Sequence, residues 1–196
     1  DMVGKFYRPV LMASFALDYH QWGLEPFGYH ISNILIHLGN ALLVYGLIRL
    51  IFRRELLAFL TAMLFVLHPV QAESVTYISG RADPLAAFFC LLAFYFFIRY
   101  VDFDGYRRKL YFGASVLSFL LALFSKESAV AFPLILIFYE ACFRKDELKG
   151  KKSAKYAFYV AILLIYGAIR HLILLNIKGT LTASGFLPLL DRFCLV

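Results

Sequence analysis

Long apolar stretches alternate with short polar ones along most of the chain. Because a helix needs about 20 mainly apolar residues to cross a bilayer, this pattern predicts about six transmembrane helices. We expect them at 31–48, 56–72, 84–98, 110–125, 128–143 and 156–177. The fifth reaches a spanning length only by running past Glu140. The predicted fold is therefore all-α, a polytopic transmembrane helical bundle.

The apolar pattern also divides the chain into three parts. Residues 1–30 are predicted to face outward, residues 31–177 to form the bundle, and residues 178–196 to face outward and begin a further apolar segment. Within the first part, Pro9 can begin a helix. An apolar face can form from Val10, Leu11, Ala13, Phe15 and Ala16. We expect residues 9–19 to be a helix lying in the membrane interface; the alternative is a loop that rests on lipid.

Composition and charge strengthen this picture and orient it. The chain is 62% hydrophobic and 17% charged, whereas a soluble domain is about 45–50% apolar and 25% charged, so an ordinary soluble enzyme is excluded. Thirteen of the 20 Lys and Arg residues lie in alternate connections, at 49–54, 99–109 and 144–155. The positive-inside rule places these connections in the cytoplasm. Residues 1–30, 69–83 and 125–128 are then predicted to face the lumen or periplasm.

Two outward connections carry more polar chemistry than a turn needs. The stretch HPVQAESVTYISGRAD (68–83) has nine polar side chains in 16 positions, and Lys126 and Glu127 lie in the next connection. Charges so near a membrane are costly unless they are solvated or paired. The alternatives are a hydrated loop in which Arg81 pairs with Asp83, and a Lys126 that extends to the headgroups.

Three blocks on the predicted outer face resemble a known family. They are YRPV, FALDY and GLEPFGYHISNILIH within residues 7–37, LFVLHPVQAESVTYISGRADPLAA at 64–87, and SKESAVAFP at 125–133. Together they look like the transmembrane-and-TPR-repeat O-mannosyltransferases and their bacterial relatives, which are GT-C membrane glycosyltransferases. The resemblance covers most of residues 5–140. A helix-pair period of about 34 residues, typical of TPR repeats, is not seen.

The resemblance implies a reaction and a missing part. The donor would be a polyprenyl-phosphate-linked sugar, classically dolichyl-phosphate mannose, and the acceptor a hydroxyl of a protein or glycan on the lumenal or periplasmic side. Such enzymes carry a catalytic acid in the first outer loop. That loop and the first transmembrane helix are expected to precede Asp1. The chain is therefore expected to be a fragment, and its catalytic residue is unknown.

The expected chemistry assigns roles to residue types. A departing lipid phosphate gains negative charge and needs cations nearby. The donor-phosphate candidates are Arg8, His68, Arg81 and Lys126, and the orienting or acceptor-side candidates are Glu73, Asp83, Glu127 and His30. We expect one outward cavity to bring together His68, Glu73, Arg81, Asp83, Lys126 and Glu127, with Arg81 oriented by Asp83. No cofactor is required; the chemistry leaves room for a divalent metal, but no metal ligand is assigned.

A second function class fits the same fold. The chain could be a non-catalytic scaffold or a transporter of lipid-linked sugars, and a transporter would place polar groups near the bilayer midplane. Asn33, His37 and Asn40 share one helix face there, although hydrogen bonding between helices is the commoner use. The expected partners are the bilayer, the donor and the acceptor, with no nucleic acid. The endoplasmic reticulum membrane and a bacterial inner membrane both fit.

Overall fold

The computed structural model describes residues 7–144 and 154–183, and these residues form helices and no strand. In chain order the elements are α1 (Pro9–Trp22), α2 (Pro26–Phe52), α3 (Glu55–Leu67), η1 (Pro69–Gln71), α4 (Ala72–Thr76), η2 (Ile78–Arg81), α5 (Ala82–Asp102), α6 (Gly105–Ser125), η3 (Glu127–Ala131), α7 (Phe132–Phe143) and α8 (Ala154–Ala183). The six predicted apolar stretches are helical apart from a break at His68 in the second one, so the all-α prediction is confirmed. The basic residues at 145–152 and the end of the predicted outward segment, 184–196, lie outside the described residues.

Three of the described helical segments are long and apolar enough to cross a membrane: Pro26–Phe52, Ile78–Asp102 and Gly105–Ser125. The helices α3 and α7 have 13 and 12 residues, which is about 20 and 18 Å, less than the roughly 30 Å of bilayer hydrocarbon. Helix α8 has 30 residues and a length of about 45 Å. The chain is an integral membrane protein, and its total of six crossings remains a prediction.

Helix boundaries follow from local chemistry. Helix α2 begins at Pro26, five residues before the predicted start, because proline suits the first helical turn. Helix α3 ends at Leu67, since the residue before a proline, His68, is held in an extended conformation. Gly105, the first residue of α6, follows the short connection from α5 and has a φ of 65°. This left-handed backbone conformation favours glycine.

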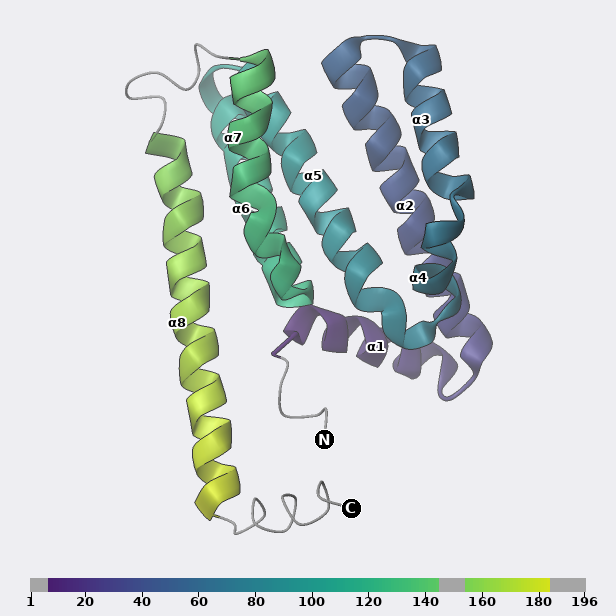
Figure 1. Cartoon of the computed structure of the whole chain (residues 1–196), viewed down its shortest axis with the longest axis vertical. Helices are drawn as coiled ribbons and strands as arrows, with labels where there is room; N and C mark the ends of the chain where they lie inside the picture. Colours follow the sequence, from purple (N-terminus) through teal and green to yellow (C-terminus); the bar gives the residue numbers. More distant parts are fainter. Residues whose placement is uncertain (1–6, 145–153, 184–196) are drawn as a thin grey trace. The chain divides into compact units, whose positions relative to one another are not determined.

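Residues 8–153 form one compact unit, and α8 belongs to a second. In the first unit α2, α3, α5 and α6 run along one direction as long ribbons (Figure 1). Small residues let the helices approach: the Ser115 hydroxyl of α6 donates to the Ala93 carbonyl of α5 over 2.7 Å. A side chain at Gly39 would come within 2.9 Å of Phe88. Contacts between small residues are typical of helices packed within a membrane.

The outer surface of this unit is largely apolar. Leu42, Leu56 and Phe138 are each about 70% exposed, on three different helices. Exposure of such an apolar surface to water is energetically unfavourable. Lipid tails are as apolar as these side chains, so contact with them has no such cost. The exposed side chains therefore form a surface suited to contact with lipid.

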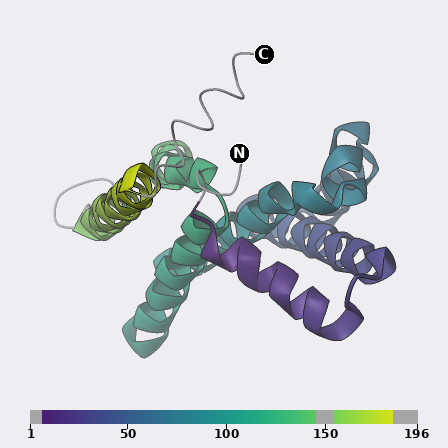
Figure 2. The same ribbon diagram turned by 90° about the horizontal axis from the view of Figure 1, so that it is seen from below.

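Helix α1 lies across the ends of the long helices rather than alongside them (Figures 1 and 2), and it contacts α2 and α6. The predicted helix is confirmed, but its predicted apolar face divides in two. Leu11, with Val10 and Phe15, packs on the start of α5 at Ala82 and Leu85. Other apolar side chains of α1 are exposed, namely Met12, Leu17 and Tyr19, whereas Trp22 is 40% exposed and its indole lies against Gly28 of α2. This exposed set gives α1 a surface suited to the interface.

Labelling can test whether α1 lies on the predicted outer side. Cysteines at Ala13 and Ala16, which are both exposed, are expected to react with a membrane-impermeant maleimide only when the lumenal face is accessible. The exposed native Cys142 near the end of α7 is the control and should react only from the cytoplasmic side. Labelling of Ala13→Cys from the cytoplasm would contradict the topology.

Charged side chains gather at the two ends of the bundle. Asp83 and Asp102 lie near the start and at the end of α5, 19 positions apart, which is about 29 Å along a helix and close to the hydrocarbon thickness. Each aspartate forms an ion pair, with Lys126 and with Arg144 respectively. The predicted outward and cytoplasmic residue sets thus lie at opposite ends; which end faces the cytoplasm stays a prediction.

Candidate functional site

Arg81 is a buried residue just before α5, and its side chain contacts both α1 and α2. Its side chain is fully buried and forms an ion pair with Asp18 of α1 at 2.5 Å. Its Nε donates to the Asn33 Oδ1 of α2 at 2.7 Å, and a second nitrogen donates to the Tyr29 carbonyl at 3.0 Å. The guanidinium also lies 4.5 Å from the Phe15 ring centroid. The side chain of Arg81 therefore clamps α1 and α2 against the start of α5.

This placement corrects two sequence predictions. Arg81 does not pair with Asp83, because Asp18 and Asn33 engage its guanidinium on the opposite side of the local backbone turn. A donor phosphate would have to displace a buried carboxylate to reach it. Arg81 is thus a structural residue, and it does not join Lys126 at the surface.

Asp18 and Asn33 were missed as partners of Arg81. Asp18 lies four and seven positions after Ser14 and Leu11, and Leu11 is buried, so helical spacing alone puts Asp18 on the inward face. Its Oδ1 accepts a hydrogen bond from Ser32 at 2.7 Å. Asn33 also donates weakly to the carbonyls of Val75 and Tyr77, at 3.5 and 3.4 Å. The signal that could have found them was a polar residue on an apolar face.

Lys126 pairs with Asp83 at the same end of the bundle. The lysine Nζ donates to Asp83 Oδ1, which joins the end of α6 to the first turn of α5. Beside it, Arg8 holds Glu127 with two parallel hydrogen bonds of 2.9 and 3.1 Å. Four of the predicted site residues therefore form two ion pairs: one joins α5 to the end of α6, and the other joins the start of α1 to η3.

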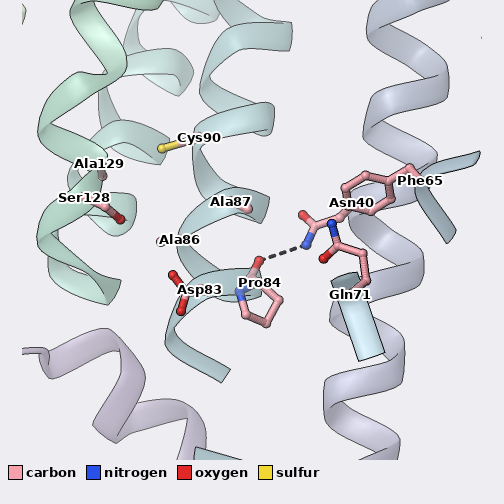
Figure 3. A pocket seen from close by; sticks show the side chains of 10 residues that line it. All are labelled: Asn40, Phe65, Gln71, Asp83, Pro84, Ala86, Ala87, Cys90, Ser128 and Ala129. Atoms are coloured by element: carbon pink, nitrogen blue, oxygen red, sulfur yellow. Dashed lines mark hydrogen bonds between the residues drawn. The ribbon is translucent and has the colours of Figure 1, made fainter. Parts of the chain in front are cut away.

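A cavity of about 300 Å³ lies next to the first of these pairs. Its lining comes from α2, α3, η1, α5 and η3, namely Asn40, Phe65, Gln71, Asp83, Pro84, Ala86, Ala87, Cys90, Ser128 and Ala129 (Figure 3). Its volume is at the lower end of the range for small-molecule sites, and its mixture of an apolar wall with a few polar groups is typical of them. The cavity has room for a small polar ligand beside the Asp83–Lys126 pair.

Asn40 supplies this cavity with an unused acceptor. Its side chain is almost fully buried, and its Nδ2 donates to the Pro84 carbonyl at 2.9 Å. Because the carbonyl can only accept, the amide nitrogen must face it, and the orientation of the amide is fixed. The Asn40 Oδ1 is buried without a hydrogen-bond partner in the described part of the chain. A buried, unsatisfied acceptor is costly, which makes Asn40 a notable polar residue in the wall of this cavity.

The other predicted site residues lie outside the cavity lining. His68 is exposed, and its Nδ1 accepts a hydrogen bond from the Val70 amide at 3.2 Å, which caps η1. Glu73 is exposed on α4, and His30 is half-buried near the start of α2. Convergence of all six predicted residues on one cavity is thus wrong: Asp83 lines it, Lys126 contacts Asp83, and Gln71, Ser128 and Asn40 complete its polar groups.

The intramembrane polar face of α2 is used between elements. Asn33 and Asn40 bind the connection to α5 and its first turn, and His37 stacks on Phe65 of α3 with ring centroids 5.2 Å apart. Helix packing therefore explains these residues without a transport path. Within residues 7–144 and 154–172, no group of three His, Cys, Asp or Glu side chains is arranged to hold a metal ion.

Comparison with known proteins identifies the family of this chain. The family model for dolichyl-phosphate-mannose-protein mannosyltransferase matches residues 22–172, which is more than half of the chain. The chain belongs to this mannosyltransferase family. The matched region contains both outer connections, the cavity and the helices that enclose it.

Two curated animal proteins illustrate the similarity. The chain is 42% identical over 99 residues to protein O-mannosyl-transferase TMTC1 of Mus musculus, covering 50% of the chain and 10% of that protein. It is 31% identical over 160 residues to protein O-mannosyl-transferase Tmtc3 of Drosophila melanogaster, covering 69% of the chain and 17% of that protein. No solved structure matches. The chain thus spans less than a fifth of the length of these two relatives.

Proposed function

We propose that the whole protein transfers mannose from a polyprenyl-phosphate carrier, dolichyl-phosphate mannose, to a serine or threonine hydroxyl of a protein. The transfer takes place on the lumenal side of the endoplasmic reticulum membrane, at the end of the bundle that carries Lys126 and Asp83. The names of the relatives, protein O-mannosyl-transferases, support the reaction. One observation carries the site: a cation held by Asp83 at the rim of a cavity that contains the unsatisfied Asn40 acceptor.

The roles follow from charge. In the reaction the bond between the anomeric carbon and the phosphate oxygen breaks, its electron pair leaves with the lipid phosphate, and the acceptor oxygen forms the new bond. Lys126 is placed to stabilise the phosphate as its charge grows, because a preorganised cation lowers the energy of such a transition state. Asp83 orients the ammonium group. Asn40, Gln71 and Ser128 would bind sugar hydroxyls in the cavity.

The proton of the acceptor hydroxyl needs a base. The family resemblance implies an acidic residue of a first outer loop, and no residue of this chain is assigned to that role. The chain therefore contributes the binding and charge-stabilising part of the site. The chemistry needs no metal, because a lysine can neutralise the leaving phosphate.

The test is donor-dependent transfer by the full-length protein in vesicles. Mannose is expected to reach serine- and threonine-containing peptides from dolichyl-phosphate mannose, with release of dolichyl phosphate. No transfer is expected from the soluble donor GDP-mannose. Binding of the lipid donor without release of dolichyl phosphate would instead indicate a scaffold, and movement of the intact donor across sealed vesicles would indicate a transporter.

A further inference from the structure

A second cavity lies at the opposite end of the bundle, where the chain is predicted to face the cytoplasm. It measures about 610 Å³ and opens between the last turns of α2 and α5 and the start of α3. Its charged lining residues are Arg49, Arg53, Arg99, Glu55 and Asp102. The chemistry of mannose transfer proposed above uses none of these side chains.

The acidic residues of this cavity are already neutralised. Asp102 pairs with Arg144 of α7, and the pKa of Arg144 is raised, since the hydrogen bond and the charge of Asp102 outweigh the opposing effect of burial. Glu55 pairs with Arg49 at 2.8 Å. The two ion pairs leave the charges of Arg53 and Arg99 without an acidic partner among the described residues.

The backbone of Arg53 and the side chain of Arg99 are fixed by their surroundings. Arg53 ends α2 in a left-handed conformation with a φ of 55°, which turns the chain into α3. Arg99 donates to the Tyr95 hydroxyl at 3.3 Å and lies 5.5 Å from the centroid of that ring. Its guanidinium also lies 5.9 Å from the centroid of the Phe103 ring. All of these partners are neutral, so the charge of Arg99 is not cancelled. A guanidinium group binds phosphate oxygens, often two at once, and both arginines line this one cavity.

The surroundings of this cavity favour a lipid phosphate over a soluble phosphate as its ligand. Exposed apolar side chains flank the cavity on α2 and α3: Phe52 is 46% exposed and Leu56 is 71% exposed. The cavity also lies about one hydrocarbon thickness from the Asp83–Lys126 pair, which is the depth of the headgroups of the other leaflet. A phospholipid can therefore place its phosphate between the arginines and its acyl chains along the apolar surface.

We propose that this cavity is a binding site for an anionic phospholipid, whose headgroup phosphate contacts Arg53 and Arg99. Basic cavities between transmembrane helices on the cytoplasmic side are suited to such headgroups. A zwitterionic lipid has the same phosphate but brings a cation beside two uncompensated arginines. The site is expected to prefer a net negative headgroup for this reason.

The test is lipid binding by the full-length protein in detergent, measured by native mass spectrometry. Phosphatidylglycerol is expected to bind at least tenfold more tightly than phosphatidylcholine with the same acyl chains. The double variant Arg53→Gln/Arg99→Gln should lose this preference. The matched control, Arg107→Gln/Lys109→Gln, removes two exposed charges from the start of α6, outside the cavity lining, and should change affinity less than twofold.

Three results would overturn the proposal. Equal binding of the two lipids would remove the anionic preference, and equal loss in the control variant would indicate diffuse charge attraction. Displacement of phosphatidylglycerol by glycerol 1-phosphate at equal concentration would make the ligand a soluble phosphate. If the double variant does not fold, Arg53→Gln alone, at an exposed position, is expected to weaken phosphatidylglycerol binding severalfold, and unchanged binding would contradict the site.

Discussion

Replacing Arg81 with methionine is expected to lower the free energy of unfolding by about 3–5 kcal/mol, the range for breaking a buried ion pair from one side. The substitution leaves the Asp18 carboxylate buried without its cation and removes the hydrogen bonds to Asn33 and Tyr29. The measurement is thermal unfolding of the purified full-length protein in detergent. Because α1 is held to the bundle partly through this residue, faster proteolysis of α1 should accompany the change.

Two further variants distinguish the effect of breaking the Arg81–Asp18 ion pair on stability from the effect of removing any positive charge. Arg54→Met removes an exposed arginine before α3 and should change stability by less than about 0.5 kcal/mol, as surface substitutions usually do. Arg81→Met/Asp18→Leu removes both charges, and it should be more stable than Arg81→Met alone since no carboxylate is left unpaired. A double variant less stable than the single one would contradict this explanation.

Replacing Lys126 with methionine is expected to reduce mannose transfer about 10²–10³-fold, the typical loss when one preorganised group facing developing charge is removed. Lys126 carries the cation that Asp83 holds at the cavity rim. Asp83→Asn keeps the cation but loosens its position, so a smaller loss is expected. The measurement is the initial rate of transfer from dolichyl-phosphate mannose, divided by the amount of folded protein.

The neighbouring ion pair provides the matched control. Arg8→Met breaks the pair with Glu127 at the same end of the bundle, yet neither residue lines the cavity. We expect lower stability and nearly normal transfer per folded molecule. Arg81→Met should likewise keep the activity of its folded fraction. Equal losses in Lys126→Met and Arg8→Met would mean that Lys126 acts only through the fold.

The helical architecture was predictable because lipid exposure leaves a simple signal. The apolar runs and the prolines at helix starts agreed with the helices of the structure, three of which are long enough to cross a membrane. The short helices α3 and α7 were harder to place. Helix α3 ends shortly before Pro69, and α7 has Pro133 in its first turn. The apolar runs alone therefore overestimated the length of both helices.

The pairing of charges was less predictable than their location. Arg81 and Asp83 are two positions apart, and their proximity in the sequence favoured a local pair. In the structure η2 and the first turn of α5 direct Arg81 inward to Asp18 and Asp83 outward to Lys126. Such pairings depend on helix rotation and on contacts between residues more than 40 positions apart. A single sequence does not encode them in its periodicity.

The cavity lining shows the same limit. Asn40 stood out as an intramembrane polar residue, but its free oxygen becomes apparent only once Pro84 engages its nitrogen. Gln71 and Ser128 come from separate connections, and the packing of η1 and η3 brings them to one cavity. Polar residues at the correct membrane face were therefore visible in the sequence, whereas their grouping required the fold.

The central claim, that the cavity beside Asp83 binds the transferred sugar, is tested most directly by filling it. Ala87 lines the cavity and Ala131 does not, although both are exposed at the same end of the bundle. Ala87→Phe is expected to reduce transfer per folded molecule by at least about 10²-fold, since displacement of a substrate by 1 Å can have this effect. Ala131→Phe should leave transfer within twofold of the wild-type rate. Normal turnover by folded Ala87→Phe protein would contradict the account.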